Sequence, residues 1–330
     1  MEPEIFAPKP QAGQPWDVAV VGSGPAALTA TIYTTRGAAS TVILGGEVWG
    51  GQLMLTTLVD NYPALPGIMG PDLMQKMKDH ATRFGGEFVQ KNVEAVDFSK
   101  KPFELTAGGT KYLAKSVIIA TGAETKWLEA PGVKEFIGKG VSSCAPCDAA
   151  FFKDKKTAVV GGGDSAMEEA LVLTKYATEV TIIHRRDAFR ASAAMQQKVL
   201  SNPKIKVLWN TEVAEVKGPP AGEAGNQKVE KVILKNNKDG TTSELALDGL
   251  FIAIGHTPST SIFSGKIELD ERGYVSVKDH TKTSVPGVFV AGDVHDYHYK
   301  QAITAAGFGC MAAMDVLAYL EEFKKEVDSQ

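Results

Sequence analysis

The sequence predicts an α/β protein with two Rossmann-like dinucleotide-binding domains. Near its start, a short apolar strand leads into a glycine-rich loop and then into a helix, and the same succession returns in the middle of the chain. One such pattern alone is weak evidence, whereas two in the same strand–loop–helix context predict two nucleotide sites. Between the two loops lies a Cys-x-x-Cys pair, which suggests that electrons pass from nucleotide cofactors to a disulfide.

The bulk composition excludes several function classes. The chain has 330 residues, of which 44% are hydrophobic and 22% charged, as in ordinary globular proteins. Its formal net charge of −4 argues against a nucleic-acid partner, and we expect no apolar run as long as the ~18–20 residues of a membrane span. Residues 1–15 are rich in proline and polar residues and should form a flexible arm. Three cysteines are too few for a secreted disulfide framework, so a cytoplasmic protein is expected.

The first nucleotide loop follows an apolar strand at residues 17–21. It reads G-x-G-x-x-A, in which Gly22 permits the tight turn and Gly24 lets the backbone approach a pyrophosphate. Ala27 permits close packing of helix on strand, and Pro25 suits the first helical turn. The amide groups at this helix N-terminus are therefore expected to face phosphates.

The ribose contact of this first site is less clear from the sequence. The helix should end near Gly37, and residues 40–44 form the next strand. A ribose-binding carboxylate is expected about 20 residues after the loop. Glu47 comes slightly late for that role, and a plain turn is an equally good interpretation. No Arg or Lys lies nearby, which disfavours NADP at this site.

Two more buried strands run into small-residue turns that a cofactor could approach. Residues 115–120 lead into Thr121-Gly122, and residues 287–291 lead into Gly292-Asp293. The carboxylate of Asp293 could accept hydrogen bonds from polyol hydroxyls. The helix predicted over residues 301–320 is rich in alanine at its start, so it can lie close to a cofactor.

The second loop follows the apolar strand at residues 157–160 and opens a helix over residues 165–176. After the next strand, at residues 179–183, comes a basic cluster where an NAD site would place its carboxylate. Guanidinium groups at that place suit a 2′-phosphate, with a solvated basic turn as the plainer alternative. The candidate residues are Gly161, Gly163, Asp164 and Ser165 in the loop, and His184, Arg185, Arg186 and Arg190 in the cluster.

The region after the second site predicts further strands. Residues 213–248 alternate in polarity enough to suggest antiparallel strands, interrupted by a flexible Gly- and Pro-rich stretch at residues 218–225. Residues 250–255 form another buried strand.

Cys144 and Cys147 have the spacing of an easily broken disulfide, and a nearby helix N-terminus would lower a thiol pKa. Asp148 is the best candidate for a general acid that protonates a departing thiolate, for which it needs a raised pKa; the alternative is a loop or capping residue. His256 is a second candidate, although a structural histidine is favoured there. Cys310 has no partner at redox spacing and is interpreted as a core residue. No metal site is expected, because zinc usually requires four ligands and no second Cys or His pair is near.

Taken together, these motifs resemble the low-molecular-weight, flavin-dependent NADPH–thioredoxin reductases over about residues 16–322. The motifs that carry the resemblance are GSGPAA at 22–27, GGQL at 50–53, CAPCD at 144–148, GGGDSA at 161–166, HRRDAFR at 184–190, AIGHTP at 253–258, AGD at 291–293 and QAITAA at 301–306.

The resemblance implies a fold of the pyridine nucleotide-disulfide oxidoreductase type, a homodimer and thioredoxin as the substrate. It implies a discontinuous FAD-binding domain at residues 16–124 and 255–330, and an inserted NADPH-binding domain at 125–254 that carries the cysteine pair. Electrons would pass from NADPH through FAD and the Cys144–Cys147 dithiol to a thioredoxin disulfide. The FAD site would include Gly22, Gly24, Gln52, Asn61, Asp293, Gln301 and Ala302, and NADPH would bind the second loop, Arg185, Arg186 and Arg190.

Three positions depart from the family pattern: Pro146 between the cysteines, Ala149 in place of a common Gly, and Lys300 in place of a common Arg. They leave the reaction intact and bear on its rate and its partner. The alternatives are a related FAD dithiol oxidase, which would have no use for the arginine cluster, and a zinc-binding interaction module.

The topology also predicts a motion. The dithiol and the NADPH site would share one rigid body and the flavin the other, so the inserted domain should rotate about hinges near residues 123–126 and 253–256 to bring each to the flavin.

Overall fold

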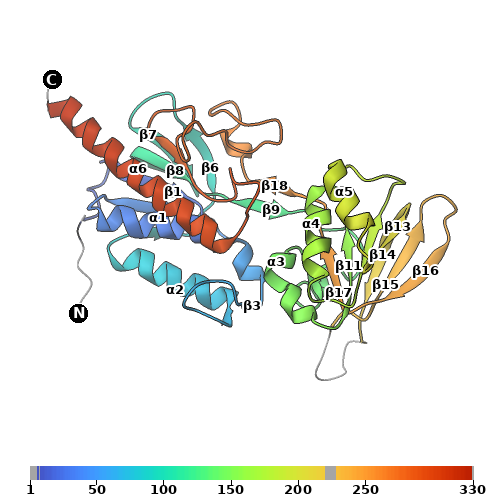
Figure 1. The fold of residues 1–330 in the computed structure, drawn as a ribbon. Helices are drawn as coiled ribbons and strands as arrows, with labels where there is room; N and C mark the ends of the chain where they lie inside the picture. Colours follow the sequence, from blue (N-terminus) through green and yellow to red (C-terminus); the bar gives the residue numbers. More distant parts are fainter. Residues whose placement is uncertain (1–5, 7, 220–227, 329–330) are drawn as a thin grey trace. The chain divides into compact units, whose positions relative to one another are not determined.

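The computed structural model describes residues 6, 8–219 and 228–328, and within it the chain divides into two compact units (Figure 1). The discontinuous unit comprises Met1–Glu124 and Thr257–Gln330, and the inserted unit comprises Thr125–His256. The predicted insertion, 125–254, ends two residues before the inserted unit does. Residues 1–5 and 7 of the predicted arm, and residues 220–227 of the predicted flexible stretch, lie outside the described residues.

The discontinuous unit is built on a mixed seven-stranded sheet in the order β5-β2-β1-β8-β7-β6, with β19 also paired to β8. The strands β5, β2, β1, β8 and β19 pair in parallel, and β7 and β6 extend the sheet in antiparallel fashion. The inner parallel strands are apolar and buried on both faces where they pair, whereas β5, at the edge, is half-buried. The bounds are β1 Trp16–Val21, β2 Thr41–Leu44, β5 Glu87–Val89, β6 Val93–Asp97, β7 Phe103–Ala107, β8 Thr110–Ile119 and β19 Val288–Val290.

Three helices belong to this unit: α1 Pro25–Arg36, α2 Gly70–Arg83 and α6 Ala302–Asp328. Helix α1 ends at the predicted place, with Gly37 as its C-cap. It packs closely on α6, because a Cβ atom added to Gly309 would lie 2.2 Å from the carbonyl oxygen of Ala26. Buried alanines of α1 and α6 line the same core cluster beside strands β1 and β19. The small-residue helix expected at the C-terminal end therefore does approach the first glycine loop closely.

The expectation about membrane spans is wrong for α6. Among the described residues, the segment Ala302–Glu322 is long and apolar enough to cross a membrane by length and composition alone. Its apolarity comes largely from small residues that pack against α1, such as Ala305, Ala312 and Ala313. A run of alanines and glycines is easily overlooked as a candidate membrane span, because it contains few long aliphatic side chains.

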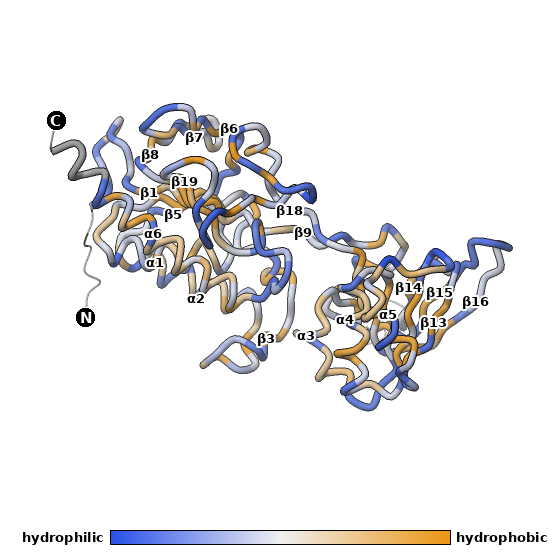
Figure 2. Tube along the Cα trace, turned by 45° about the horizontal axis from the view of Figure 1, so that its top comes forward, coloured by the Kyte–Doolittle hydropathy of each residue, from blue (hydrophilic) through white to orange (hydrophobic). Residues whose placement is uncertain are grey.

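The inserted unit combines a parallel sheet with a small antiparallel one. The parallel sheet has the order β10-β17-β11-β12-β13, and its central strands β17, β11 and β12 are almost wholly buried. Figure 2 shows hydrophobic segments along this unit. The antiparallel sheet, β14-β15-β16, matches the alternation predicted for residues 213–248. The bounds are β10 Val141–Ser142, α3 Ala145–Asp148, β11 Lys156–Val160, α4 Asp164–Leu173, β12 Glu179–His184, α5 Ala193–Leu200, β13 Ile205–Trp209, β14 Thr211–Lys217, β15 Lys231–Asn236, β16 Thr242–Ala246 and β17 Gly249–Ile252.

The chain passes between the units through β9 Ala123–Thr125 and β18 His256–Pro258, which pair with each other. The remaining strands, β3 Leu58–Val59 and β4 Ile68–Met69, form a short hairpin after the 3-10 turn Gly51–Leu55. Strand β17 stops at Ile252, earlier than predicted, where its partner strand β11 also ends, at Val160. Helix α4 ends at Leu173, three residues before the predicted end at Tyr176.

Candidate active site

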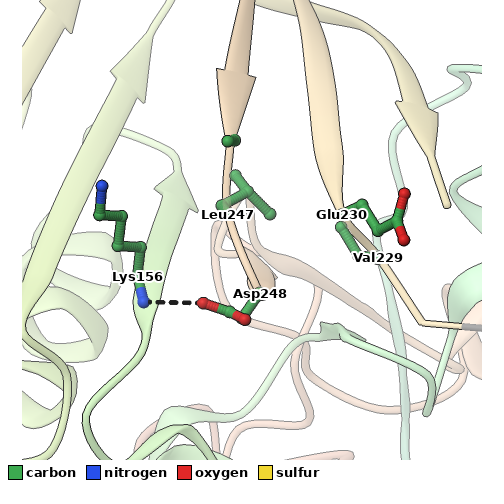
Figure 3. A pocket seen from close by; sticks show the side chains of 6 residues that line it. Lys156, Val229, Glu230, Leu247 and Asp248 are labelled. Carbon is green, nitrogen blue, oxygen red and sulfur yellow. Dashed lines mark hydrogen bonds between the residues drawn. The ribbon is translucent and has the colours of Figure 1, made fainter.

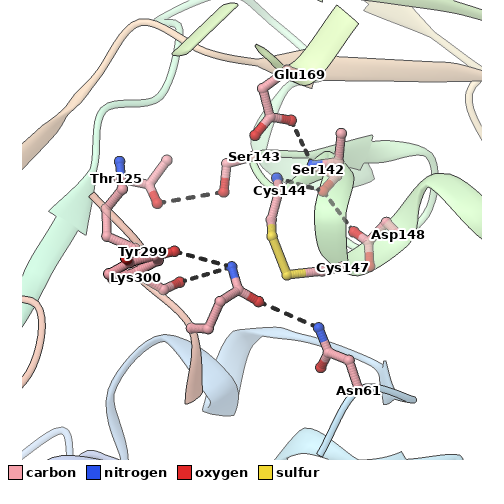
Figure 4. The surroundings of a disulfide bond; sticks show 12 residues. Asn61, Thr125, Ser142, Ser143, Cys144, Cys147, Asp148, Glu169, Tyr299 and Lys300 are labelled. Carbon is pink, nitrogen blue, oxygen red and sulfur yellow. Dashed lines mark hydrogen bonds between the residues drawn. A yellow bond between two sulfur atoms is a disulfide. The ribbon is translucent and has the colours of Figure 1, made fainter. Parts of the chain in front are cut away.

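Cys144 and Cys147 form a disulfide at the edge of the inserted unit's sheet (Figure 4). Strand β10 leads into the pair, Cys144 is the N-cap of α3, and Cys147 lies inside that short helix. The two Cα atoms are 5.3 Å apart, which a helical turn provides for residues three positions apart. Both cysteines are half-buried. The spacing predicted a disulfide between these two cysteines, and the structure adds that Cys144 lies at the start of a helix.

Asp148 lies beside the disulfide and is held by Ser142. The Ser142 hydroxyl donates a 2.6 Å hydrogen bond to Oδ2 of Asp148 and accepts a 3.1 Å bond from the backbone N–H of Cys144 (Figure 4). Burial raises the pKa of the Asp148 carboxyl, and the bond from Ser142 opposes that rise without cancelling it. Asp148 therefore keeps its proton to a higher pH than an ordinary aspartate, as a proton donor must.

Glu169 is a residue near the disulfide that the sequence did not single out. It lies on α4, and its Oε2 accepts a 2.5 Å hydrogen bond from the backbone N–H of Ala145, one residue after Cys144. Nothing in the linear sequence places this side chain near the pair, because the contact depends on the packing of α3 on α4. Ser142 was also missed; its bond to Asp148 joins the end of β10 to α3.

The second glycine loop has the tight geometry that its pattern predicts. A Cβ atom on Gly161 would lie 2.4 Å from the carbonyl oxygen of Ala253, and one on Gly162 would lie 2.2 Å from the ring of His184. Gly163, the N-cap of α4, has no atom within 4 Å of such a position and no side-chain cap. The loop packs against protein atoms at Gly161 and Gly162 and is open at Gly163, where a ligand has room to approach the N-terminus of α4. Of the first-turn N–H groups, that of Ala166 already donates to the carbonyl oxygen of Gly163.

The predicted basic cluster divides into one buried and three exposed side chains. His184 is buried at the end of β12, and its Nε2 lies 3.0 Å from the carbonyl oxygen of Ala188. Its ring packs against Gly162 of the glycine loop, so it does not lie at the surface with the arginines. Arg185, Arg186 and Arg190 are exposed, and the backbone N–H of Arg190 donates a 2.7 Å bond to the carbonyl oxygen of Gly162. That bond ties the cluster to the glycine loop.

The two polar residues of the second loop have different surroundings. Asp164 accepts hydrogen bonds from the N–H (2.9 Å) and the hydroxyl (2.7 Å) of Ser192, the N-cap of α5, and these bonds lower its pKa. Asp164 thus links the loop to α5. Ser165, in the first turn of α4, is exposed.

The first glycine loop, in the discontinuous unit, repeats this construction. Gly22 has a φ of +119°, and a Cβ atom on it would lie 2.2 Å from the carbonyl oxygen of Ala120. Gly24 is the N-cap of α1, with open space at its Cβ position, and Pro25 is the first helical residue. Ala27 is fully buried on the helix face that meets the sheet. Each residue therefore has the surroundings that its place in the pattern requires.

The fold brings together residues of this unit that are far apart in the sequence. The Nδ2 group of Asn61 donates a 3.3 Å hydrogen bond to Oε1 of Gln301, across 240 positions (Figure 4). Ala302 follows as the first residue of α6, and Gln52 is exposed on the 3-10 turn Gly51–Leu55. Thr121 donates a 2.7 Å bond to the carbonyl oxygen of Ser259, and the carbonyl oxygen of Gly122 accepts one of 3.0 Å from the N–H of Ser259.

Asp293 lies in the turn after β19 and carries a buried acceptor oxygen. Its Oδ1 has no hydrogen bond within the described residues. Burial raises the pKa of Asp293 to about 7, and the neighbouring Asp296 adds to the rise. Gly292, with a φ of +78°, brings this turn against α1, since a Cβ atom there would lie 2.9 Å from that of Ala26. An unsatisfied buried carboxylate next to a phosphate-binding helix start fits the hydroxyl-rich chain of a flavin dinucleotide.

Cys310 departs from its predicted place in the core. It is half-buried on α6, and its thiol interacts with the hydroxyl of Tyr33, whose pKa it raises. It forms no disulfide.

A pocket of about 240 Å³ lies elsewhere in the inserted unit (Figure 3). Across it, the backbone N–H of Lys156 donates a 3.0 Å bond to Oδ2 of Asp248. None of the candidate residues lines it. Its walls are formed by Lys156, Val229, Glu230, Ala246, Leu247 and Asp248. Within the described part of the chain, no group of three or more metal-ligating side chains occurs.

Comparisons with known proteins agree with this geometry. The profile of the pyridine nucleotide-disulphide oxidoreductases matches residues 16–309. Thioredoxin reductase 2 of Arabidopsis thaliana is 50% identical over 319 residues, covering 92% of this chain and 82% of that protein. Thioredoxin reductase of Rickettsia felis is 48% identical over 311 residues, covering 92% of this chain and 98% of that protein. The solved thioredoxin reductase of Giardia duodenalis is 42% identical with a TM-score of 0.88, covering 93% of this chain and all of that chain. The chain therefore belongs to the pyridine nucleotide-disulphide oxidoreductase family and, within it, to the low-molecular-weight thioredoxin reductases, which are NADPH-dependent flavoprotein disulfide reductases that use FAD.

Proposed function

We propose that this chain carries electrons from NADPH through FAD and the Cys144–Cys147 pair to a thioredoxin disulfide. The observation that carries the proposal is the disulfide itself, which lies in the same unit as a glycine loop bordered by three exposed arginines. When bound, FAD supplies the two-electron chemistry that links a nicotinamide to a disulfide. The remaining tasks fall to side chains and backbone groups of the chain.

The first of these tasks is to hold FAD on the discontinuous unit. The open first turn of α1 offers N–H groups to the pyrophosphate, and Asp293 offers its free oxygen to hydroxyls. The Asn61–Gln301 pair and the Thr121-Gly122 turn are fixed by hydrogen bonds, so they are ready to orient a ligand. The proposed FAD residues are Gly22, Gly24, Pro25, Ala27, Gln52, Asn61, Thr121, Gly122, Gly292, Asp293, Gln301 and Ala302.

The second task is to select NADPH on the inserted unit. The first turn of α4 offers N–H groups to the pyrophosphate, and the guanidinium groups of Arg185, Arg186 and Arg190 suit the 2′-phosphate. His184 and Asp164 keep the loop and the cluster in place through their bonds to Ala188 and Ser192. Gly161, Gly163 and Ser165 complete the proposed site.

The third task is disulfide exchange. Reduction of the Cys144–Cys147 bond takes up two electrons and two protons and yields two thiols. One of them, as a thiolate, attacks a sulfur of the thioredoxin disulfide, and a mixed disulfide forms as the partner's other sulfur leaves. Asp148, with its raised pKa, is the proposed donor of a proton to the departing thiolate.

The assembly and location of the protein are further parts of the proposal. We expect a homodimer, because apolar side chains of α1 and α6 are exposed side by side: Tyr33 is 44% exposed, Met311 37% and Met314 60%. A second copy of this chain would cover them. The cysteine usage favours the cytoplasm. The dithiol oxidase gains no support, since the relatives described above are thioredoxin reductases.

An anaerobic titration with NADPH and with NADH, followed by addition of thioredoxin, tests the proposal. NADPH should bleach the flavin absorbance at far lower concentration than NADH, and thioredoxin should restore it. In Cys144→Ser or Cys147→Ser, the bleaching should persist while thioredoxin reduction is abolished. The matched control is Cys310→Ser, which should retain both steps. Bleaching of the wild type that thioredoxin does not reverse would refute the assigned substrate.

A further inference from the structure

Two consecutive peptide N–H groups at the start of the redox helix are hydrogen-bonded, one to the Ser142 hydroxyl and the other to the Glu169 carboxylate. The N–H of Cys144 reaches Asp148 through the Ser142 hydroxyl, by bonds of 3.1 and 2.6 Å. The next N–H, of Ala145, donates directly to Glu169 at 2.5 Å (Figure 4). The second bond joins different elements, since Ala145 begins α3 and Glu169 lies in α4.

We propose that Glu169 is a positioning residue that sets the thiol pKa, and with it the reduction potential, of the Cys144–Cys147 pair. This inference rests on the proposed redox role of that pair. The Glu169 carboxylate is bound to the residue that follows Cys144, and its negative charge disfavours a thiolate at Cys144. It also occupies an N–H group that would otherwise stabilise the thiolate. Both effects raise the pKa of the thiol.

Few other charges of the inserted unit compete with this effect. The described elements that pack most extensively on α3 are α4 and the 3-10 turn Ala149–Phe152, and that turn has no charged side chain. On α4, Glu168 is exposed, and Asp164 is bound to Ser192. Asp148, on α3 itself, is bonded to the Ser142 hydroxyl, and burial raises the pKa of its carboxyl. Glu169 on α4 is thus the acidic side chain that binds the backbone of the disulfide segment directly.

The redox consequence follows from the proton balance. Below the thiol pKa, the disulfide takes up two electrons and two protons; above it, only one proton is taken up and a thiolate remains. If Glu169 raises the thiol pKa, both cysteines of the reduced pair stay protonated up to a higher pH. The reduced pair then lacks the stabilisation that ionisation to a thiolate would give it. The reduced pair therefore gives its electrons to a partner disulfide more readily.

The neighbouring glutamates allow a matched test. In a Cys310→Ser background, the holoenzyme and its Glu169→Gln and Glu168→Gln variants are reduced with dithiothreitol and alkylated with iodoacetamide from pH 5 to 10. Glutamine keeps an acceptor for the Ala145 N–H and removes only the charge. For a pKa drop of about one unit, thiolate near neutral pH rises about tenfold and intrinsic nucleophilicity falls about threefold, so alkylation should rise about threefold. Glu168→Gln should match the parent.

Equilibration with glutathione supplies a second readout. Glu169→Gln should shift the pair toward its reduced form, and Glu169→Ala, which also frees the N–H, should shift it further. Identical alkylation profiles and glutathione equilibria for Glu169→Gln and Glu168→Gln would overturn the inference. A parent protein whose Cys144 and Cys147 form no reversible disulfide would instead overturn the proposed function itself.

Discussion

Asp148 and Asp293 show how surroundings adapt one residue type to two tasks. Burial raises the pKa of both carboxyl groups. Asp148 receives a hydrogen bond from Ser142 and lies beside a disulfide, where a retained proton is useful. Asp293 has a buried oxygen without a partner among the described residues, so a ligand donor would satisfy it. The first carboxyl is suited to give a proton and the second to accept a hydrogen bond.

The pKa of Asp293 predicts how FAD affinity depends on pH. Its carboxylate should accept from a flavin hydroxyl, and without ligand that carboxyl has a pKa of about 7. FAD binding then favours the ionised form, so affinity should rise as pH increases toward and through 7. Asp293→Asn should remove this pH dependence and weaken binding at pH 8 by about 1.5–3 kcal/mol, or roughly tenfold to a hundredfold. The dissociation constant from flavin fluorescence between pH 5.5 and 8.5 checks both expectations.

The control for that experiment is Glu321→Gln, at an exposed position of α6. It should bind FAD as the wild type does at every pH. A wild-type affinity that is flat across neutral pH would contradict the role assigned to Asp293.

At the residue scale, the sequence predicted the groups whose function depends on local pattern. The glycines of both loops and the Cys144–Cys147 pair are recognisable because a few adjacent positions define their geometry. Ser142 and Glu169 could not be found in this way, since their roles arise from contacts between separate elements. The sequence likewise could not show that His184, which was expected to bind a cofactor together with the arginines, is buried against the glycine loop.

At the element scale, the strand–loop–helix units were predictable and their ends were less so. Strands β1, β2, β11 and β12 lie within one residue of the predicted bounds, because apolar runs and glycines mark both ends. The predicted C-terminal ends of β17 and α4 lie about three residues beyond the observed ends, because no proline marks either boundary. The close packing of α1 on α6 depends on small residues far apart in the sequence, so the sequence did not predict it.

That closeness gives a stability prediction with a matched pair on one helix. In Gly309→Ala, the new methyl would meet the carbonyl oxygen of Ala26 at 2.2 Å, so α1 and α6 must separate. Overpacking of this kind costs about 1–3 kcal/mol. Gly307→Ala, with no atom within 4 Å, should instead stabilise the helix by about 0.5–1 kcal/mol. Thermal denaturation should show a lower Tm for the first variant and an equal or higher Tm for the second. Equal melting of both variants would mean that α6 tolerates a larger residue at this contact.

At the scale of the whole molecule, the division into two units has a mechanical consequence. The cysteine pair and the proposed NADPH loop lie together in the inserted unit, while the proposed FAD residues lie in the discontinuous one. Hydride transfer and disulfide reduction must both take place at the flavin ring, where space is limited. A single rigid arrangement would have to satisfy both at once, so we expect the inserted unit to rotate between two orientations during turnover.

The crossings between the units offer a direct test of that rotation. Gly255 lies next to β18, has a φ of +106°, and leaves open space where a Cβ atom would be. Alanine there meets no steric clash but disfavours this backbone conformation by about 1–3 kcal/mol. Gly255→Ala should therefore shift the balance between orientations, so that the rates of flavin reduction by NADPH and of thioredoxin reduction change in opposite directions. Stopped-flow absorbance of each half-reaction measures these rates separately. Gly240→Ala is the matched control, since Gly240 has a φ of +74° and equal space in the β15–β16 hairpin, away from the crossings. If Gly255→Ala leaves both half-reactions at the rates of Gly240→Ala, the crossing at Gly255 does not serve as a hinge.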